Sequence, residues 1–190
     1  MPKSLFIFSI FYGGMCCIAG VLGAKQVAIG PLAVEAGIFP FLLLVITSSA
    51  VAELYGAERA NALVRFGFIP LIASILLIQL VLALPTDAGM YPPAIEAFPI
   101  ILGQSGRMMF AGLISYGLSQ TLNVYVFARL ARPEGGLLWL RAGVASVLSQ
   151  IIDTVLFISI SFYGEREIAG LMAGQMTAKI VLSVLLVPLL

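Results

Sequence analysis

The chain has 190 residues, of which 61% are hydrophobic and only 10% are charged, and its formal net charge is +1. An ordinary soluble domain carries roughly 25% charged residues and cannot bury every side chain, so this composition excludes a soluble domain and predicts an integral membrane protein. The near-zero charge also gives no indication of a nucleic-acid-binding surface or of an acidic partner.

Six apolar stretches follow one another, each close to the roughly 20 residues that a bilayer crossing requires. They are predicted at about 5–24, 36–55, 64–84, 106–128, 138–162 and 168–189. The first resembles a signal peptide, but the five that follow argue that it is retained. We therefore expect an all-α bundle of six transmembrane helices that forms a single domain over residues 1–190.

The first stretch contains Cys16, Gly20 and Ala24 at four-residue spacing, and small residues on one stripe let helix backbones approach closely. Either packing within the bundle or docking of a separate subunit explains this stripe. Cys16 and Cys17 are adjacent and bridge poorly on a helix, so we interpret them as packing residues. The chain has no histidine, the usual zinc ligand and the usual base of nucleophile triads, and we predict neither a metal site nor a cofactor.

The segments between the stretches contain glycine, proline or charged residues, which mark turns. Residues 25–31 are expected to form a short turn and residues 56–61 a charged connection. The 85–105 segment is too apolar for a solvated loop and is expected to dip back into the membrane. Within it, Pro99 and Gly103 are expected to break any helix.

The second stretch has two further features. Phe39-Pro40 near its start predicts a broken or kinked helix, and broken helices often expose backbone groups to a bound solute. Glu53 near its end is either an interfacial anchor beside Arg59 or a binding residue, and Tyr55 is typical of an aromatic belt.

The basic residues favour an orientation with the N-terminus inside, because cytoplasmic connections carry an excess of Lys and Arg. On this topology six basic residues fall on the cytoplasmic side and three on the far side. They are Lys3, Arg59, Arg65, Arg129, Arg132 and Arg141 against Lys25, Arg107 and Arg166. Both termini are therefore expected in the cytoplasm.

Polar residues follow one face of each of the last three stretches, at steps of three or four that place them on one side of a helix. They are Tyr116, Gln120 and Asn123 in the fourth stretch, Ser146, Gln150, Asp153, Thr154 and Phe157 in the fifth, and Gln175, Lys179 and Ser183 in the sixth. Polar groups at membrane depth are costly unless they face a partner or a cavity. We expect these faces to converge on a polar cavity.

Asp153 and Lys179 are the central pair of this predicted cavity, since each is a formal charge at membrane depth and each can neutralise the other. A buried ion pair that only fixes helix register is the structural explanation. The surrounding carboxamides favour binding of a planar solute, because they supply donors and acceptors in one place. An intramembrane enzyme with Asp153 and Glu53 as acid and base is a minor alternative, because these residues lie in different stretches at different depths.

A specific pattern extends over several stretches. It comprises Glu53-Leu54-Tyr55-Gly56, Ser119-Gln120-Thr121-Leu122-Asn123, Trp139-Leu140-Arg141, Gln150, Asp153-Thr154, Phe157, Gln175 and Lys179. In this pattern the chain resembles, over roughly residues 36–190, the queuosine precursor transporter family of vitamin-uptake-like membrane proteins. The resemblance implies a protein of the prokaryotic inner (cytoplasmic) membrane that imports 7-deazaguanines such as preQ0, preQ1 or queuine for the tRNA modification queuosine. Its implied partners are the lipid bilayer and a deazapurine solute, and assembly into a homo-oligomer is left open.

The residue chemistry agrees with such a solute. A carboxylate can accept two adjacent N–H donors of a guanine-like edge, an amide or ammonium can satisfy an O6-type acceptor, and aromatic rings either stack on the solute or serve as packing. The predicted substrate-binding residues are Asp153, Gln150, Gln120, Asn123, Lys179, Tyr116, Phe157, Gln175 and Glu53.

The chain departs from the family pattern at two places. It has Ser48-Ser49 where members commonly carry Thr-Asp, and Asn123 where they carry Asp. The main alternative function is that of a substrate-binding subunit of an energy-coupling vitamin transporter. Such a protein also has six helices around one ligand, and it would need an ATPase module in trans.

Overall fold

The computed structural model describes residues 2–29, 32–103, 106–131, 137–164 and 167–186. Arg132, Arg166 and the last residues of the sixth predicted stretch lie outside this part of the chain. The elements in chain order are α1 (Lys3–Gly23), β1 (Gln26–Ile29), β2 (Leu32–Glu35), α2 (Ile38–Tyr55), α3 (Ala57–Ala83), α4 (Pro92–Leu102), α5 (Gly106–Arg129), α6 (Leu138–Phe162) and α7 (Ala169–Leu186).

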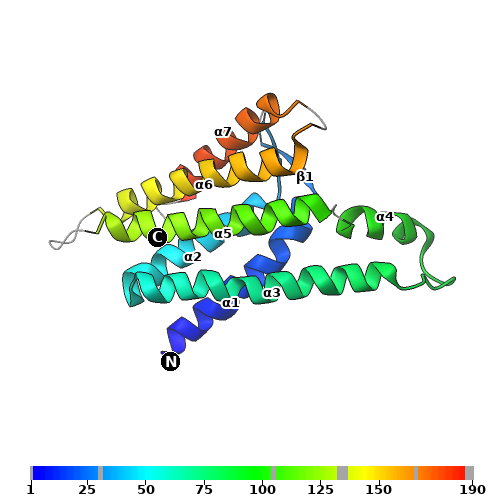
Figure 1. Cartoon of the computed structure of the whole chain (residues 1–190), viewed down its shortest axis with the longest axis horizontal. Coiled ribbons are helices and arrows are strands. Elements are labelled where there is room, and N and C mark those ends of the chain that lie inside the picture. The colour runs from blue at the N-terminus through cyan, green and yellow to red at the C-terminus, as the bar shows by residue number, and fades with distance from the viewer. Residues whose placement is uncertain (1, 30–31, 104–105, 132–136, 165–166, 187–190) are drawn as a thin grey trace.

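The long helices lie side by side in one bundle with two distinct ends (Figure 1). At the left end, the start of α1 meets the end of α2 through a hydrogen bond between the Ser4 and Tyr55 hydroxyls, and the start of α6 meets α2 through Arg141 and Glu53. We call this the Arg141 end. The other end carries the β1–β2 hairpin, where β2 packs beside α7, and we call it the hairpin end.

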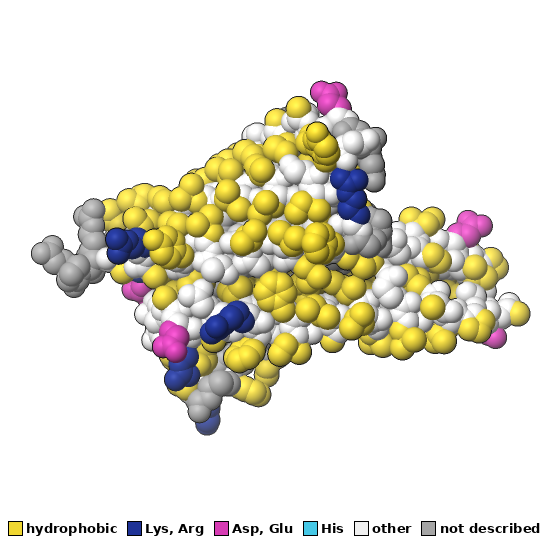
Figure 2. Space-filling model, in the orientation of Figure 1, with side chains coloured by type: hydrophobic (Ala, Val, Ile, Leu, Met, Phe, Trp, Pro, Cys, Tyr) yellow, Lys and Arg dark blue, Asp and Glu magenta, His cyan; other side chains and the backbone are white. Residues whose placement is uncertain are grey.

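The surface between the two ends is apolar. Figure 2 shows hydrophobic side chains over most of the visible face, with charged groups gathered mainly toward the helix ends. Within the described residues, four helices are each long and apolar enough to cross a membrane, namely α1, α2, α3 and α6, and a fifth crossing results if α4 and α5 are taken together. The chain is therefore a polytopic helical membrane protein, while the sixth crossing and the cytoplasmic termini stay predictions.

Among the described residues, α5 and α6 share the most extensive contact of any two helices. Both helices bury small side chains, which let two backbones approach closely in a membrane. Those on α5 include Ala111, Ser115 and Ser119, and those on α6 include Ala142, Ala145 and Ser149. This close packing places the polar residues of the two helices against each other.

The expected short turn at residues 25–31 is wrong. That segment contains β1, which pairs antiparallel with β2 in a register that sets Gln26 opposite Glu35 and Val27 opposite Val34. Branched residues at alternating positions favour strands, and two short runs are enough for a hairpin. The hairpin lies between α1 and α2 in the chain, at the hairpin end of the bundle.

The 85–105 segment contains a helix that the sequence analysis did not expect. α4 starts with Pro92 and Pro93. In the first turn of a helix the backbone N–H groups have no partner within the helix, so a proline there costs no hydrogen bond. Pro99 lies inside the helix rather than breaking it, whereas Gly103 ends it as expected. All the side chains of α4 are outside the buried core, so the single hydrogen bond lost at Pro99 is not compounded by a packing defect.

The second and third stretches also differ from expectation. Pro40 lies in the first turn of α2, where its missing N–H has no helical partner to lose, so α2 runs unbroken through the position of the predicted kink. α3 begins at Ala57 rather than near residue 64. Gly56 alone separates the two helices, with φ 85° and ψ 159°, a backbone conformation that is essentially restricted to glycine.

Candidate functional site

The central feature of the bundle is a buried ion pair between α6 and α7. The Nζ atom of Lys179 donates to Oδ2 of Asp153 at 2.8 Å, and the two residues are only 8% and 5% exposed. The hydroxyl of Ser119 on α5 donates to the other carboxylate oxygen at 3.5 Å. Three helices thus meet at Asp153. The contact between Asp153 and Lys179 is the pairing of charges that was expected from the sequence.

A cavity of about 190 Å³ lies beside this pair, toward the hairpin end. Since one water occupies about 30 Å³ of liquid volume, the cavity has room for several waters or for a small heterocycle. Its walls come from all seven helices of the described chain and from β2, and most of the lining side chains are apolar. The polar lining residues are Glu35, Ser74, Ser115, Tyr116, Asp153 and Lys179.

The nine residues predicted to bind substrate fall into three groups. Asp153, Lys179, Tyr116 and Phe157 line the cavity. Gln120, Asn123, Gln150 and Gln175 are buried on the same helices without lining it. Glu53 lies about 14 Å farther along α2 than the cavity-lining Leu44, because it is nine positions later and the helix rises 1.5 Å per residue.

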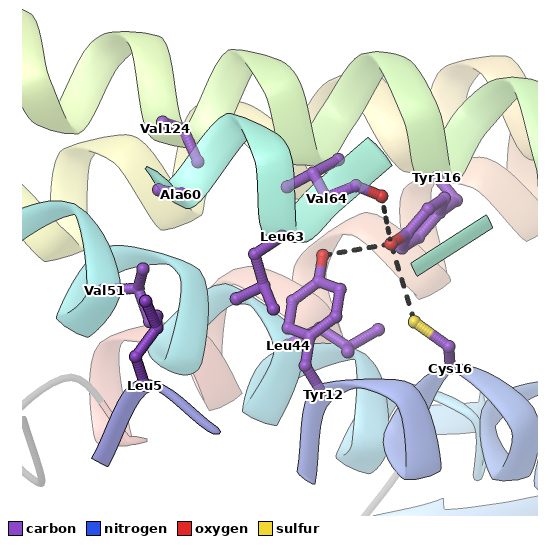
Figure 3. Close-up of a cluster of buried hydrophobic side chains, with 10 residues drawn as sticks. All are labelled: Leu5, Tyr12, Cys16, Leu44, Val51, Ala60, Leu63, Val64, Tyr116 and Val124. Carbon is purple, nitrogen blue, oxygen red and sulfur yellow. Dashed lines mark hydrogen bonds between the residues drawn. The ribbon is translucent and has the colours of Figure 1, made fainter. Parts of the chain in front are cut away.

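Tyr116 is held in place from three sides, as Figure 3 shows. Its hydroxyl is hydrogen-bonded to the carbonyl oxygen of Val64 and to the hydroxyl of Tyr12, each at 3.1 Å, and it accepts a hydrogen bond from the thiol of Cys16 at 3.5 Å. Its ring meets that of Phe68 edge to face, with centroids 4.9 Å apart. The cavity wall at Tyr116 is therefore preorganised by α1 and α3.

Gly67 is required by this arrangement of tyrosines. A Cβ at this position would lie 2.8 Å from a ring carbon of Tyr12 and would overlap the hydroxyl of Tyr116. Gly67→Ala is therefore expected to destabilise the protein by about 1–3 kcal/mol, the usual cost of overpacking, and to lower its melting temperature in detergent. Gly14→Ala is the control, because no atom lies within 4 Å of a Cβ there; equal melting temperatures for both variants would contradict this reading of the contact.

Several lining residues were not predicted from the sequence, among them Phe41, Glu35 and Ser115. Phe41 places its ring centroid 5.8 Å from Nζ of Lys179, within the range of a cation–π contact, and Glu35 and Ser115 lie in the cavity wall. Phe41 is two positions after Phe39 in an apolar helix, so nothing in its sequence context distinguishes it. Glu35 is the one with a signal, since it is a carboxylate directly before an apolar stretch.

Gln120 and Asn123 connect α5 to α2. The carbonyl oxygen of Gln120 accepts from the hydroxyl of Ser48 at 3.3 Å, and the amide nitrogen of Asn123 donates to the hydroxyls of Ser48 and Ser49 at 3.0 and 3.1 Å. The two places where the chain departs from the family pattern are thus in direct contact. In this chain Ser48, Ser49 and Asn123 form an uncharged hydrogen-bonded contact between α2 and α5.

The Arg141 end is closed by a second charge pair. The guanidinium of Arg141 lies 3.0 Å from the carboxylate of Glu53, with side-chain exposures of 12% and 41%. It also donates to the carbonyl oxygen of Phe127 at 3.3 Å and lies 4.3 Å over the ring of that residue. Arg141 therefore joins α6 to α2 and α5.

The two partners of this pair are expected to differ in their contribution to stability. Glu53→Gln should lower the free energy of unfolding by less than about 1 kcal/mol, because the carboxylate is substantially exposed. Arg141→Met should cost more, because it also removes the contacts to Phe127. Thermal melting of the purified variants compares their stabilities, and a larger drop in melting temperature for Glu53→Gln than for Arg141→Met would refute this ranking. Uptake kinetics of Glu53→Gln separately test the predicted role of Glu53 in substrate binding.

The small-residue stripe of α1 is only partly turned into the bundle, since Cys16 is buried whereas Gly20 and Ala24 are exposed. Cys16 is 2% exposed and contacts Tyr116, and Gly20 lines the cavity. Packing within the bundle therefore explains Cys16, while the exposed Ala24 leaves docking of a separate subunit open for the outer part of the stripe.

Comparison with known proteins identifies the family to which this site belongs. Residues 35–190 match the family model described as "Putative vitamin uptake transporter". The chain is also 29% identical over 158 residues to the "Probable queuosine precursor transporter" of Bacillus subtilis (strain 168), an alignment that covers 82% of this chain and 68% of that protein. No solved structure matches the chain.

Proposed function

The chain belongs to the vitamin uptake transporter family, and from this premise we propose that it imports queuosine precursors, 7-deazaguanines such as preQ0, preQ1 or queuine. The observation that carries the proposal is the Asp153–Lys179 pair in the wall of the cavity. Membership in a transporter family argues against an intramembrane enzyme, and the similar protein from Bacillus subtilis is named for transport of the same class of solute.

The ion pair supplies the hydrogen-bonding groups that a guanine-like edge needs. The carboxylate of Asp153 can accept two adjacent N–H donors in a bidentate manner, and the ammonium of Lys179 can donate to a neighbouring carbonyl oxygen. Both groups lie in the cavity wall, so a solute can contact them without prior rearrangement of the helices. Each would exchange part of its bond to the other for a bond to the solute.

The aromatic residues of the cavity suit the flat face of the same solute. Tyr116 and Phe157 line the cavity, and Tyr116 is fixed by its hydrogen bonds to Val64 and Tyr12. A fixed ring loses little conformational entropy when a heterocycle stacks on it, and aromatic contacts of this kind contribute about 0.5–1.5 kcal/mol beyond burial. We propose these two rings as the stacking surfaces.

The position of the cavity agrees with import. On the predicted topology the hairpin end faces away from the cytoplasm, so a solute from outside would reach the cavity first and Asp153 at its inner boundary. The cavity would thus be the outward-facing binding position, in the cytoplasmic membrane of a prokaryotic cell.

A strain that neither makes queuosine precursors nor has its own importer tests the proposal. Expression of this chain with low external preQ0, preQ1 or queuine should restore queuosine in tRNA, measured by mass spectrometry of digested tRNA. Absence of rescue with all three compounds, despite protein in the membrane fraction, would refute the proposal.

The alternative of a binding subunit that needs an ATPase in trans is separated by a second measurement. The purified protein alone in liposomes should take up the rescuing compound. Binding of the compound without uptake would favour the alternative.

A further inference from the structure

Four of the nine buried side-chain atoms that lack a hydrogen-bond partner among the described residues lie one helical turn beyond the Asp153–Lys179 pair. Gln150 has no partner for its amide oxygen or its amide nitrogen, Asn123 has none for Oδ1, and Ser183 has none for its hydroxyl, among the residues that the structure describes. All three residues are fully buried, and they lie outside the cavity lining. We call these three residues the inner polar layer.

The helix register places the members of this layer at one level. α5 and α6 run antiparallel, because Ser119 contacts Asp153 at one level and Phe127 contacts Arg141 at another; α7 runs back along α6 in Figure 1. From this level, Asn123 is four residues beyond Ser119, and Gln150 is three residues before Asp153. Each is thus displaced by about 4.5–6 Å toward the Arg141 end.

Ser183 follows the same rule on α7. It lies four residues beyond Lys179, the partner of Asp153, and therefore about 6 Å nearer the Arg141 end. Steps of three and four residues keep each side chain on the same helix face as the residue that defines the level. Three helices thus carry unpaired polar groups at one level of the bundle.

The inner polar layer is a poor arrangement for stability alone. A buried donor or acceptor without a partner bears its full desolvation cost, and four such atoms are gathered here. The oxygen of Asn123 is also oriented, because its amide nitrogen is held by Ser48 and Ser49. Such an arrangement calls for an occupant with its own donors and acceptors.

We infer that the inner polar layer is a second binding position on the transport path, which takes the amide-like edge of an uncharged heterocycle after it has passed Asp153 and Lys179. The inference rests on the proposed function. The free amide of Gln150 offers a donor beside an acceptor, which matches an adjacent N–H and C=O on a lactam ring. The layer carries no formal charge, so it selects this neutral edge and leaves charged substituents to the ion pair.

Matched serine and isosteric variants test the inference with purified protein in liposomes. Gln150→Met preserves volume, and Ser183→Ala removes one unpaired hydroxyl. Ser149→Ala is the control, because Ser149 is equally buried but donates to the carbonyl of Ser146 in its own helix. Equilibrium binding of labelled preQ1, its rate of uptake and the melting temperature without solute are measured for each protein.

Gln150→Met is expected to bind preQ1 within about threefold of wild type, because the cavity is intact, while uptake falls by about tenfold or more, the effect of losing roughly 1.4 kcal/mol at the second position. Its melting temperature should stay equal or rise by about 2 °C, since unpaired polar atoms are removed. Ser183→Ala should change in the same direction with a smaller amplitude, and Ser149→Ala should take up preQ1 as wild type does.

Two outcomes would overturn the inference. Unchanged uptake in Gln150→Met would show that the path avoids the layer, and a lower melting temperature with a proportional loss of binding would show that the layer is structural. Failure of the proposed function is distinct, because wild type would then neither bind nor take up preQ0, preQ1 or queuine.

Discussion

Asp153→Asn is expected to abolish deazaguanine uptake and to destabilise the protein by about 3–5 kcal/mol, the cost of breaking a buried ion pair by removing one partner. The ammonium of Lys179 would keep its buried position without the carboxylate that now lies 2.8 Å away. Asparagine also has a single side-chain acceptor oxygen, so it cannot accept two N–H bonds in the bidentate manner of a carboxylate. Initial uptake rates in liposomes and thermal melting measure the two effects.

The double variant Asp153→Asn, Lys179→Met separates binding from stability. It removes both charges, and replacement of a whole buried pair is often neutral or stabilising, so the melting temperature should return close to that of wild type. Uptake should remain absent. If uptake returns together with stability, the pair only fixes helix register and its proposed role in binding is wrong.

The second large effect is expected from filling the cavity. Gly112 lines the cavity, and no atom lies within 4 Å of a Cβ built at this position. Gly112→Phe should place a ring in the space proposed for the solute and lower uptake by about tenfold or more, equivalent to at least 1.4 kcal/mol of lost binding. The helix itself should not oppose the change, because phenylalanine is more favourable than glycine inside a helix.

Gly14→Phe is the matched control for this change. Gly14 has the same open space for a Cβ but lies on α1 outside the cavity lining. It should be inserted into the membrane and transport as wild type does. An equal loss of uptake in both variants would mean that a large side chain interferes with assembly, and would contradict the proposed place of the solute.

The helices were predictable from the sequence because a bilayer crossing imposes a length on an apolar run. The stretch predicted at 138–162 coincides with α6, and the one at 36–55 differs from α2 only at its start. The failures occurred where local chemistry is ambiguous. Proline inside a helix usually breaks it, but Pro99 is tolerated in the short, exposed α4. The strands β1 and β2 have four residues each, which is too short for their alternation of side chains to be recognised in the sequence.

The candidate site was predictable as a set of helix faces but not as a cavity. The spacing of Asp153 and Lys179 within their stretches placed both charges at membrane depth, and the structure brings them into contact. The depth of the neighbouring carboxamides relative to the cavity depends on how α5, α6 and α7 are aligned with one another. That alignment is a tertiary property, so the separation of Gln150 and Asn123 from the cavity could not be derived from spacing alone.

The polar face of α5 also has a consequence for how the chain enters the membrane. α5 does not qualify as a crossing by itself, whereas α6 does, because its central turns carry Tyr116, Gln120 and Asn123. A translocon partitions each segment by its summed hydrophobicity, so α5 is expected to partition into lipid less readily than α6 when presented alone. Its integration is therefore expected to be assisted by both neighbours, by the apolar α4 with which it qualifies as one bent crossing and by α6, which packs against its polar face.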